Sequence, residues 1–112
     1  MKYMMFVASD TEPDTSQSPL PSIDEWFSAI SEYGKWVIGD RLRPVSDATL
    51  VRVRDGELMV TDGAFTESKE CIAGFDVLEC DSLDEAIAIA AKHPMARAGR
   101  IELRALWPFD SD

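Results

Sequence analysis

The sequence predicts a single α+β domain in which helices alternate with antiparallel strands. Two helix-like segments begin at capping boxes, an Asp-Gly pair joins two alternating runs, and short apolar runs stand near both ends of the chain. The length of 112 residues suits one domain. We therefore expect one unit over residues 1–112, with a flexible loop at 9–22 and a tail at 108–112.

The first elements are a strand and a loop. Residues 2–8, KYMMFVA, form a short apolar run that is typical of a strand packed on both faces. Tyr3, Met5 and Val7 share one face, because side chains alternate along a strand. The loop at 9–22 follows, since three prolines among Ser, Thr and Asp residues fit neither helical nor strand periodicity.

A long first helix is expected next. Apolar residues recur at helical spacing from Ile23 to Ile38, and Ser22 with Glu25 forms a capping box. Gly39 stands where a C-cap glycine belongs. A short strand closed by a turn is expected at 41–48, where a proline cannot donate to a sheet.

Residues 49–62 predict a hairpin. Asp55-Gly56 supplies the positive φ angles of a type I′ turn between two alternating runs. The turn fixes the register, which places four aliphatic side chains on one face and an Arg54–Glu57 ion-pair candidate on the other. The expected pairs are Arg54–Glu57, Val53–Leu58, Arg52–Met59 and Val51–Val60.

The last third predicts a strand, a helix and a strand. Residues 74–81 are apolar on both sides, with Phe75 and Val77 facing one way. A second capping box, Ser82 with Glu85, opens a helix that stops at His93-Pro94. Its expected apolar stripe contains Leu83, Ala86, Ile87, Ala90 and Ala91. Residues 101–107 close the chain as a strand.

This order of elements is a split βαβ arrangement of the ferredoxin-like kind, with an inserted hairpin and both helices on one face of the sheet. The other face would expose apolar side chains over an area that is unusual for a soluble monomer. We expect a second copy to cover it in a homodimer, with pockets between the layers. The alternative is a monomer in which loop 9–22 folds over the sheet.

Composition excludes several classes of function. A formal net charge of −10 disfavours nucleic acid and anionic membrane surfaces, and no apolar run approaches a membrane span. The N-terminus lacks the features of a secretory signal, so we expect a cytoplasmic chain. Cys71 and Cys80 lack metal-ligand spacing, and no glycine-rich phosphate loop occurs, so no metal or other cofactor is predicted.

The run VRVRDGELMVTDGAFTESKECIAGFDVLECDSLDEAIAIAAKHP, followed by GRIELRALW, resembles the YCII-related family, in particular its DGPF-domain branch. Ala64 replaces the proline of the DGPF signature. The resemblance implies a dimeric α/β barrel with no established activity, often encoded beside extracytoplasmic sigma factors. Matching signature positions are Asp62, Gly63, Phe65, Glu67, Lys69, Glu70, Gly74 and Phe75.

Three residues are candidates for acid–base catalysis. Asp62 ends the hairpin's apolar face, where a carboxylate is either a turn acceptor or a desolvated acid–base group. Lys69 could hold an anion or polarise a carbonyl, or could stand in a solvated loop. His93 could be a general base or could cap the second helix as a cation. The histidine that related YCII chains carry early in the sequence is missing here.

Four further residues are candidates for ligand binding. Phe65 could stack on a ligand or fill the core or dimer seam. Arg52 could form a bidentate contact with a carboxylate or simply face solvent, and Glu67 and Glu70 share the solvated-loop alternative. The preferred hypothesis is a homodimer that binds a small organic molecule near the DGAF loop, with acid–base catalysis there. The alternative is a non-catalytic sensor or protein-interaction domain, regulatory and linked to sigma factors.

Overall fold

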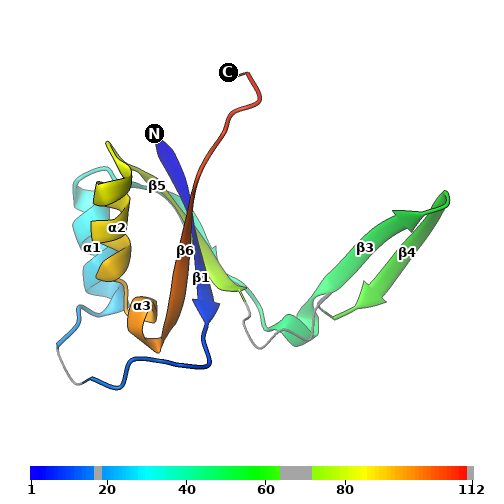
Figure 1. Cartoon of the computed structure of the whole chain (residues 1–112), viewed down its shortest axis with the longest axis horizontal. Coiled ribbons are helices and arrows are strands. Elements are labelled where there is room, and N and C mark those ends of the chain that lie inside the picture. The colour runs from blue at the N-terminus through cyan, green and yellow to red at the C-terminus, as the bar shows by residue number, and fades with distance from the viewer. Residues whose placement is uncertain (17–18, 64–71, 111–112) are drawn as a thin grey trace.

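The chain folds into a four-stranded antiparallel sheet with helices on one side, and a separate two-stranded hairpin projects from it (Figure 1). The computed structural model describes residues 1–16, 19–63 and 72–110. In chain order the elements are β1 (Lys2–Ser9), α1 (Ile23–Glu32), β2 (Trp36–Arg41), the 3₁₀ turn η1 (Val45–Asp47), β3 (Thr49–Arg54), β4 (Glu57–Asp62), β5 (Ile72–Glu79), α2 (Leu83–Ala91), α3 (Met95–Ala98) and β6 (Gly99–Ala105).

The strand order β2-β5-β1-β6 is that of a ferredoxin-like α+β fold, so the predicted fold class is confirmed. β1 pairs with both β5 and β6, and its residues Tyr3, Met5 and Val7 are buried beneath the helices. Trp26 and Ile30 of α1 pack in the same core cluster. The alternation predicted for the first strand therefore separates the core face from the opposite face.

The long first helix was predicted beyond its real end. Gly34 adopts a φ of +69°, which a helix cannot continue, and α1 stops at Glu32. Trp36, Val37 and Ile38 are apolar at helical spacing but belong to the edge strand β2. Gly39 is consequently a strand residue and not a helix C-cap, and the strand expected at 41–48 lies upstream of its predicted place.

The hairpin of β3 and β4 matches the predicted register in every pair. Asp55 and Gly56 have φ angles of +52° and +79°, as a type I′ turn requires. The ion pair expected between Arg54 and Glu57 is absent from the described residues, and Arg54 instead donates to the Val53 carbonyl. We call this hairpin the arm, because it extends away from the sheet (Figure 1).

Both predicted capping serines are confirmed, but only one capping box is reciprocal. Ser22 accepts from the Glu25 N–H, and the Glu25 carboxylate accepts from the Ser22 N–H. Ser82 likewise accepts from the Glu85 N–H, but the Glu85 carboxylate accepts from the backbone N–H of Asp81 and not from that of Ser82. The predicted stripe of α2 was partly wrong, since Ala86 and Ala90 are buried while Leu83, Ile87 and Ala91 are exposed.

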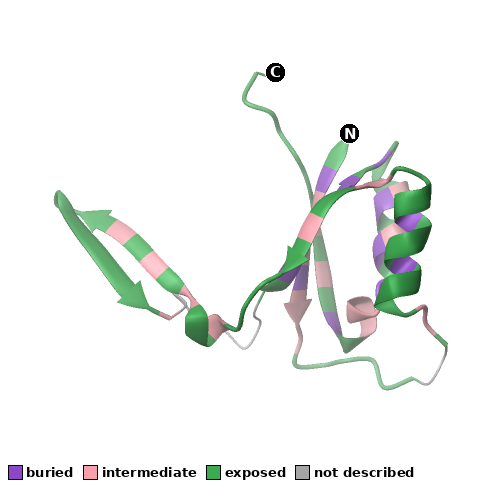
Figure 2. Ribbon diagram, turned by 180° about the vertical axis from the view of Figure 1, so that it is seen from behind, coloured by how far each residue is buried: buried purple, intermediate pink, exposed green. Residues whose placement is uncertain are grey.

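The face of the sheet opposite the helices has no covering element among the described residues. Pairing places apolar side chains at its centre and a charged row along β6. We call this surface the open face; it contains Met4, Phe6, Ile38, Phe75 and Val77, with Arg100, Glu102 and Arg104 beside them. Among these apolar side chains Ile38 is 53% exposed, Met4, Phe6 and Phe75 are partly buried, and Val77 is buried at 8%. Figure 2 shows the partial burial of the strands.

Loop 9–22 does not cover the open face in its described part. Asp14 N–H donates to the Arg97 carbonyl, and the two side chains form an ion pair at 3.4 Å. These contacts hold the loop beside α3, at the end of the sheet near the helices (Figure 1). The monomer alternative, in which this loop folds over the sheet, therefore receives no support.

Candidate functional site

The turn at Asp62-Gly63, which we call the signature turn because it begins the family signature, lies at the base of the arm. Asp62 is the last residue of β4, opposite Thr49, and it is exposed. Gly63 has a φ of +94° and its N–H donates to the Ala48 carbonyl at 2.7 Å. Gly63 thus supplies a backbone conformation that other residues adopt at a cost, while the role of the Asp62 carboxylate stays a prediction.

Most of the predicted ligand-binding residues lie outside the described part of the chain. These are Phe65, Glu67 and Glu70, and the catalytic candidate Lys69 also lies there, together with Ala64 and Cys71. Arg52 lies in the middle of the arm, paired with Met59 on the face away from the aliphatic side chains. The predicted site near the signature loop therefore stays a prediction.

His93 occupies a different part of the molecule from Asp62. It follows α2 and is only 5% exposed, with its ring in edge contact with Trp26 at a centroid distance of 4.6 Å. Its Nδ1 accepts from the Met95 N–H at 3.0 Å, so the neutral ring carries its proton on Nε2. Burial lowers the pKa of His93, which disfavours the cationic capping role. Within a protomer, α2 and α3, which flank His93, lie beside the four-stranded sheet, whereas β4, which ends at Asp62, belongs to the projecting hairpin (Figure 1).

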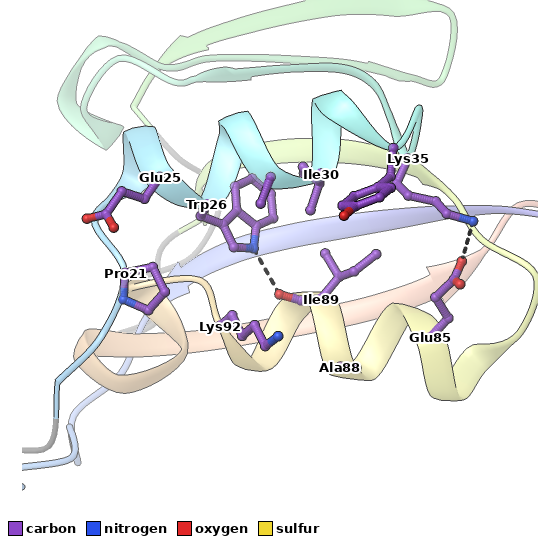
Figure 3. Close-up of a pocket in the computed structure, with 11 residues that line it drawn as sticks. Pro21, Glu25, Trp26, Ile30, Lys35, Glu85, Ala88, Ile89 and Lys92 are labelled. Carbon is purple, nitrogen blue, oxygen red and sulfur yellow. Dashed lines mark hydrogen bonds and ion pairs between the residues drawn. The ribbon is translucent and has the colours of Figure 1, made fainter.

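A pocket that the sequence did not reveal lies between α1 and α2 (Figure 3). Its volume is about 480 Å³, within the usual range for small-molecule sites. Trp26, Ile30 and Ile89 form its inner wall, and the Trp26 indole donates to the Ile89 carbonyl at 2.9 Å. The remaining lining residues are Pro21, Glu25, Ala29, Tyr33, Lys35, Glu85, Ala88 and Lys92.

The charged side chains at the rim of this pocket differ in whether they already have an ion-pair or hydrogen-bond partner. Lys35 Nζ lies 2.9 Å from Glu85 Oε1 and 3.8 Å from Asp81 Oδ2. The hydrogen bond to Glu85 raises the pKa of Lys35, and the same bond lowers the pKa of Glu85. The Glu25 carboxylate is engaged by the N-cap of α1. Lys92 differs from the other three, because among the described residues its ammonium has neither an ion pair nor a hydrogen bond.

Sequence reasoning missed this pocket because its walls come from alanines and helix faces that look ordinary. Ala29 and Ala88 are small and exposed, so two helices that approach each other leave space above them. The only local signal is an aromatic pair, Trp26 and Tyr33, seven residues apart on one helix. The facing helix is fixed by tertiary packing and not by any motif.

Asp76 is a second group that the sequence did not single out. It lies on the helix-covered side of β5 and accepts from Trp36 Nε1 at 2.9 Å. Partial burial raises the pKa of its carboxyl, and the nearby Asp40 charge adds to the increase. The Trp36 hydrogen bond acts in the opposite direction. Asp76 does not line the pocket between the helices.

The described residues contain no cluster of three His, Cys, Asp or Glu side chains that could hold a metal ion. Cys80 is free and buried in the core, and burial raises the pKa of its thiol, as expected for an unreactive cysteine. Within the described ranges, no helix is long and apolar enough to cross a membrane.

Comparison with known proteins gives two matches. A family model described as the YCII-related domain matches residues 1–110. The chain is also 44% identical over 59 residues to an uncharacterized protein of Rhizobium meliloti (strain 1021). That match spans 53% of this chain and 48% of the relative, so the chain spans about half the length of the protein it resembles.

Proposed function

Because the chain belongs to the YCII-related family, whose domain spans residues 1–110, we propose that it is a homodimeric domain that binds a small organic acid. The observation that carries the proposal is the pocket between α1 and α2. It combines an aromatic and aliphatic inner wall with the ammonium group of Lys92 at its rim, which has no ion pair among the described residues. The proposed ligand has an apolar or aromatic body and a single carboxylate.

The pocket's dimensions and wall support a small molecule rather than a protein segment. A ligand in a site of this kind buries most of its surface against apolar side chains, and a few polar groups fix its orientation. Trp26 and Ile30 offer an apolar surface that is already ordered by the core. The charge of Lys92 then favours an acid over a neutral molecule by the modest energy of an exposed ion pair, about 0.5 kcal/mol.

Binding is better supported than proton transfer at this pocket. The raised pKa of Lys35 keeps its amine protonated near neutral pH, so it serves as a cation and not as a general base. His93 does not line the pocket. Acid–base catalysis therefore remains with Asp62 at the signature turn, which is the second position at which a ligand is proposed.

The homodimer is proposed from the open face. Its apolar centre has no cover within the described protomer, and contiguous apolar patches of several hundred Å² usually mark an interface. A second copy supplies the same surface by a two-fold axis, which is the commonest arrangement of soluble oligomers. The signature turn at Asp62 would then lie beside the seam between the protomers.

The ligand proposal is tested by thermal-shift screening with benzoate, phenylacetate and hexanoate. A ligand at about 100 times its Kd stabilises the folded state by about 2.7 kcal/mol, which corresponds to several degrees in Tm. We expect Ala88→Phe, which fills the pocket, to remove the shift, and Lys92→Ala to weaken the binding about twofold to fivefold. Lys2→Ala, a lysine on β1 away from the pocket, is the matched control and should leave the shift unchanged.

Two results would contradict the pocket assignment. If Asp62→Asn removes the shift and Ala88→Phe does not, the ligand binds at the signature turn instead. If no acid produces a shift in the unmodified protein, the alternative of a non-catalytic interaction domain is favoured.

A further inference from the structure

The arm exposes its whole aliphatic face. Val51, Val53, Leu58 and Val60 are 61%, 59%, 68% and 57% exposed, although the hairpin register gathers them on one side. Isolated surface aliphatics are ordinary, but four in adjacent cross-strand pairs form a continuous apolar surface. A two-stranded hairpin is also only marginally stable by itself in water. This surface therefore needs a partner.

Within residues 1–16, 19–63 and 72–110, the arm's own protomer provides no partner for this surface. It extends on the side of the sheet opposite the helices, and Figures 1 and 2 both show it diverging from the strands. The Gly63 N–H to Ala48 carbonyl bond closes the base of the arm, and the Leu42 N–H to Ala73 carbonyl bond continues the pairing of β2 with β5 where the chain leaves the sheet. The radius of gyration of 16.4 Å exceeds the value of about 13 Å expected for a compact domain of this size.

We infer that the arm packs its aliphatic face on the sheet of a second copy of the chain, and that the two arms are exchanged across the dimer axis. This inference rests on the proposed homodimer and specifies which element holds it together. Each protomer then contributes its signature turn, at the base of the arm, to the edge of the seam. A position beside Asp62 is thus completed by the partner and is incomplete in an isolated protomer.

The areas favour this arrangement over either surface acting alone. Burial of a Val or Leu side chain removes on the order of 60–100 Å² from water, so the four side chains of one arm supply roughly 300 Å². A standard interface needs about 800 Å² from each partner. The arm alone is too small for a stable dimer, and the apolar centre of the open face can contribute the remainder.

A second copy suits these surfaces better than an unrelated protein, because both halves of the contact are present on this chain. The arm's aliphatic face contains no charged residue between Val51 and Val60, and the open face has an apolar centre. The net charge of −10 repels identical copies at long range, so the contact must be apolar and should strengthen as salt screens that repulsion.

The direct test is isotope-filtered NMR on an equal mixture of carbon-13-labelled and unlabelled protein. We expect intermolecular NOEs from the methyl groups of Val53 and Leu58 to the partner's side chains, including the rings of Phe6 and Phe75. If intermolecular NOEs connect only open-face residues and none reaches an arm methyl, arm exchange is wrong while the proposed homodimer stands. If no intermolecular NOE occurs because the protein is monomeric, both proposals are wrong.

A pair of variants gives a second, independent measurement. Leu58→Asp and Thr61→Asp add the same charge to the same strand, but on opposite faces of the arm, and both positions are exposed, so neither should unfold the protomer. We expect Leu58→Asp to raise the dimer dissociation constant about 100-fold, because two symmetric apolar contacts each acquire a buried charge. Thr61→Asp should change it less than threefold. Equal effects of the two substitutions would overturn the inference.

Discussion

Gly39→Ala should destabilise the protein, although replacing glycine in a strand is usually favourable. A Cβ at position 39 would meet the Asp76 Oδ1 atom well inside van der Waals contact, and would lie 2.6 Å from the backbone oxygen of Phe75. Asp76 can move aside only by giving up its hydrogen bond from Trp36 Nε1. The backbone of β5 can move only by distorting the sheet.

The magnitudes decide the direction. Overpacking costs about 1–3 kcal/mol, and a lost hydrogen bond to a carboxylate costs about 1.5 kcal/mol. The lower entropy of the unfolded chain returns only about 0.4–1 kcal/mol. We therefore expect the free energy of unfolding to fall by about 2–3 kcal/mol in urea denaturation at a fixed protein concentration.

A second substitution, Asp76→Ala, makes this prediction specific to the strand position of Gly39. In an Asp76→Ala background the side-chain clash is gone and only the Phe75 carbonyl contact remains, so the cost of Gly39→Ala should fall by at least 1 kcal/mol. If Gly39→Ala costs the same in both backgrounds, the two residues are not in contact. That result would refute the assignment of residues 36–41 to an edge strand beside β5.

Three other substitutions test the packing and titration described above. Burial lowers the pKa of folded His93 below its unfolded value near 6.5, so its contribution to stability should be lost as pH falls below about 6.5. In urea titrations from pH 8 to 5.5, His93→Gln should reduce this loss. Identical slopes of the free energy of unfolding against pH in the two proteins would contradict it. Trp26→Phe should lower the free energy of unfolding by about 1–3 kcal/mol, because it deletes the hydrogen bond to Ile89 and part of a buried ring, and a loss below 0.5 kcal/mol would be inconsistent with the packing. Asp76→Asn should make the protein more stable at pH 7, because burial raises the carboxyl pKa and disfavours the ionised form, while the amide oxygen can still accept from Trp36. The gain in stability should disappear as pH falls and the wild-type carboxyl becomes protonated. A gain that is the same at every pH would contradict this cause.

Local chemistry made some elements predictable from sequence. The hairpin register follows from Asp55-Gly56 alone, because a two-residue type I′ turn leaves one pairing. The N-cap serines are predictable for the same reason, because each accepts a hydrogen bond within the first turn of its own helix. The end of α1 was mispredicted because Trp36, Val37 and Ile38 satisfy the helical pattern and, equally, the needs of a strand. Only the positive φ of Gly34 and the pairing with β5 decide between them.

The pocket and the Asp76 contact depend on tertiary structure. Ala29 and Ala88 become a pocket wall only when α1 and α2 lie side by side, and no spacing within either helix reveals this. The pKa of the Asp76 carboxyl is raised because the fold partly buries it and places the Asp40 charge nearby. The candidate site predicted from the family signature, by contrast, falls mostly on residues 64–71, outside the described part of the chain.

Sedimentation velocity of the unmodified chain at micromolar concentration tests the central claim that a second copy covers the open face. The protomer has a mass of 12.5 kDa, and we expect a single species of twice that mass, whose dissociation constant stays the same or falls in higher salt. A species of 12.5 kDa throughout the concentration range would contradict it, since Ile38 and the aliphatic face of the arm would then remain in water.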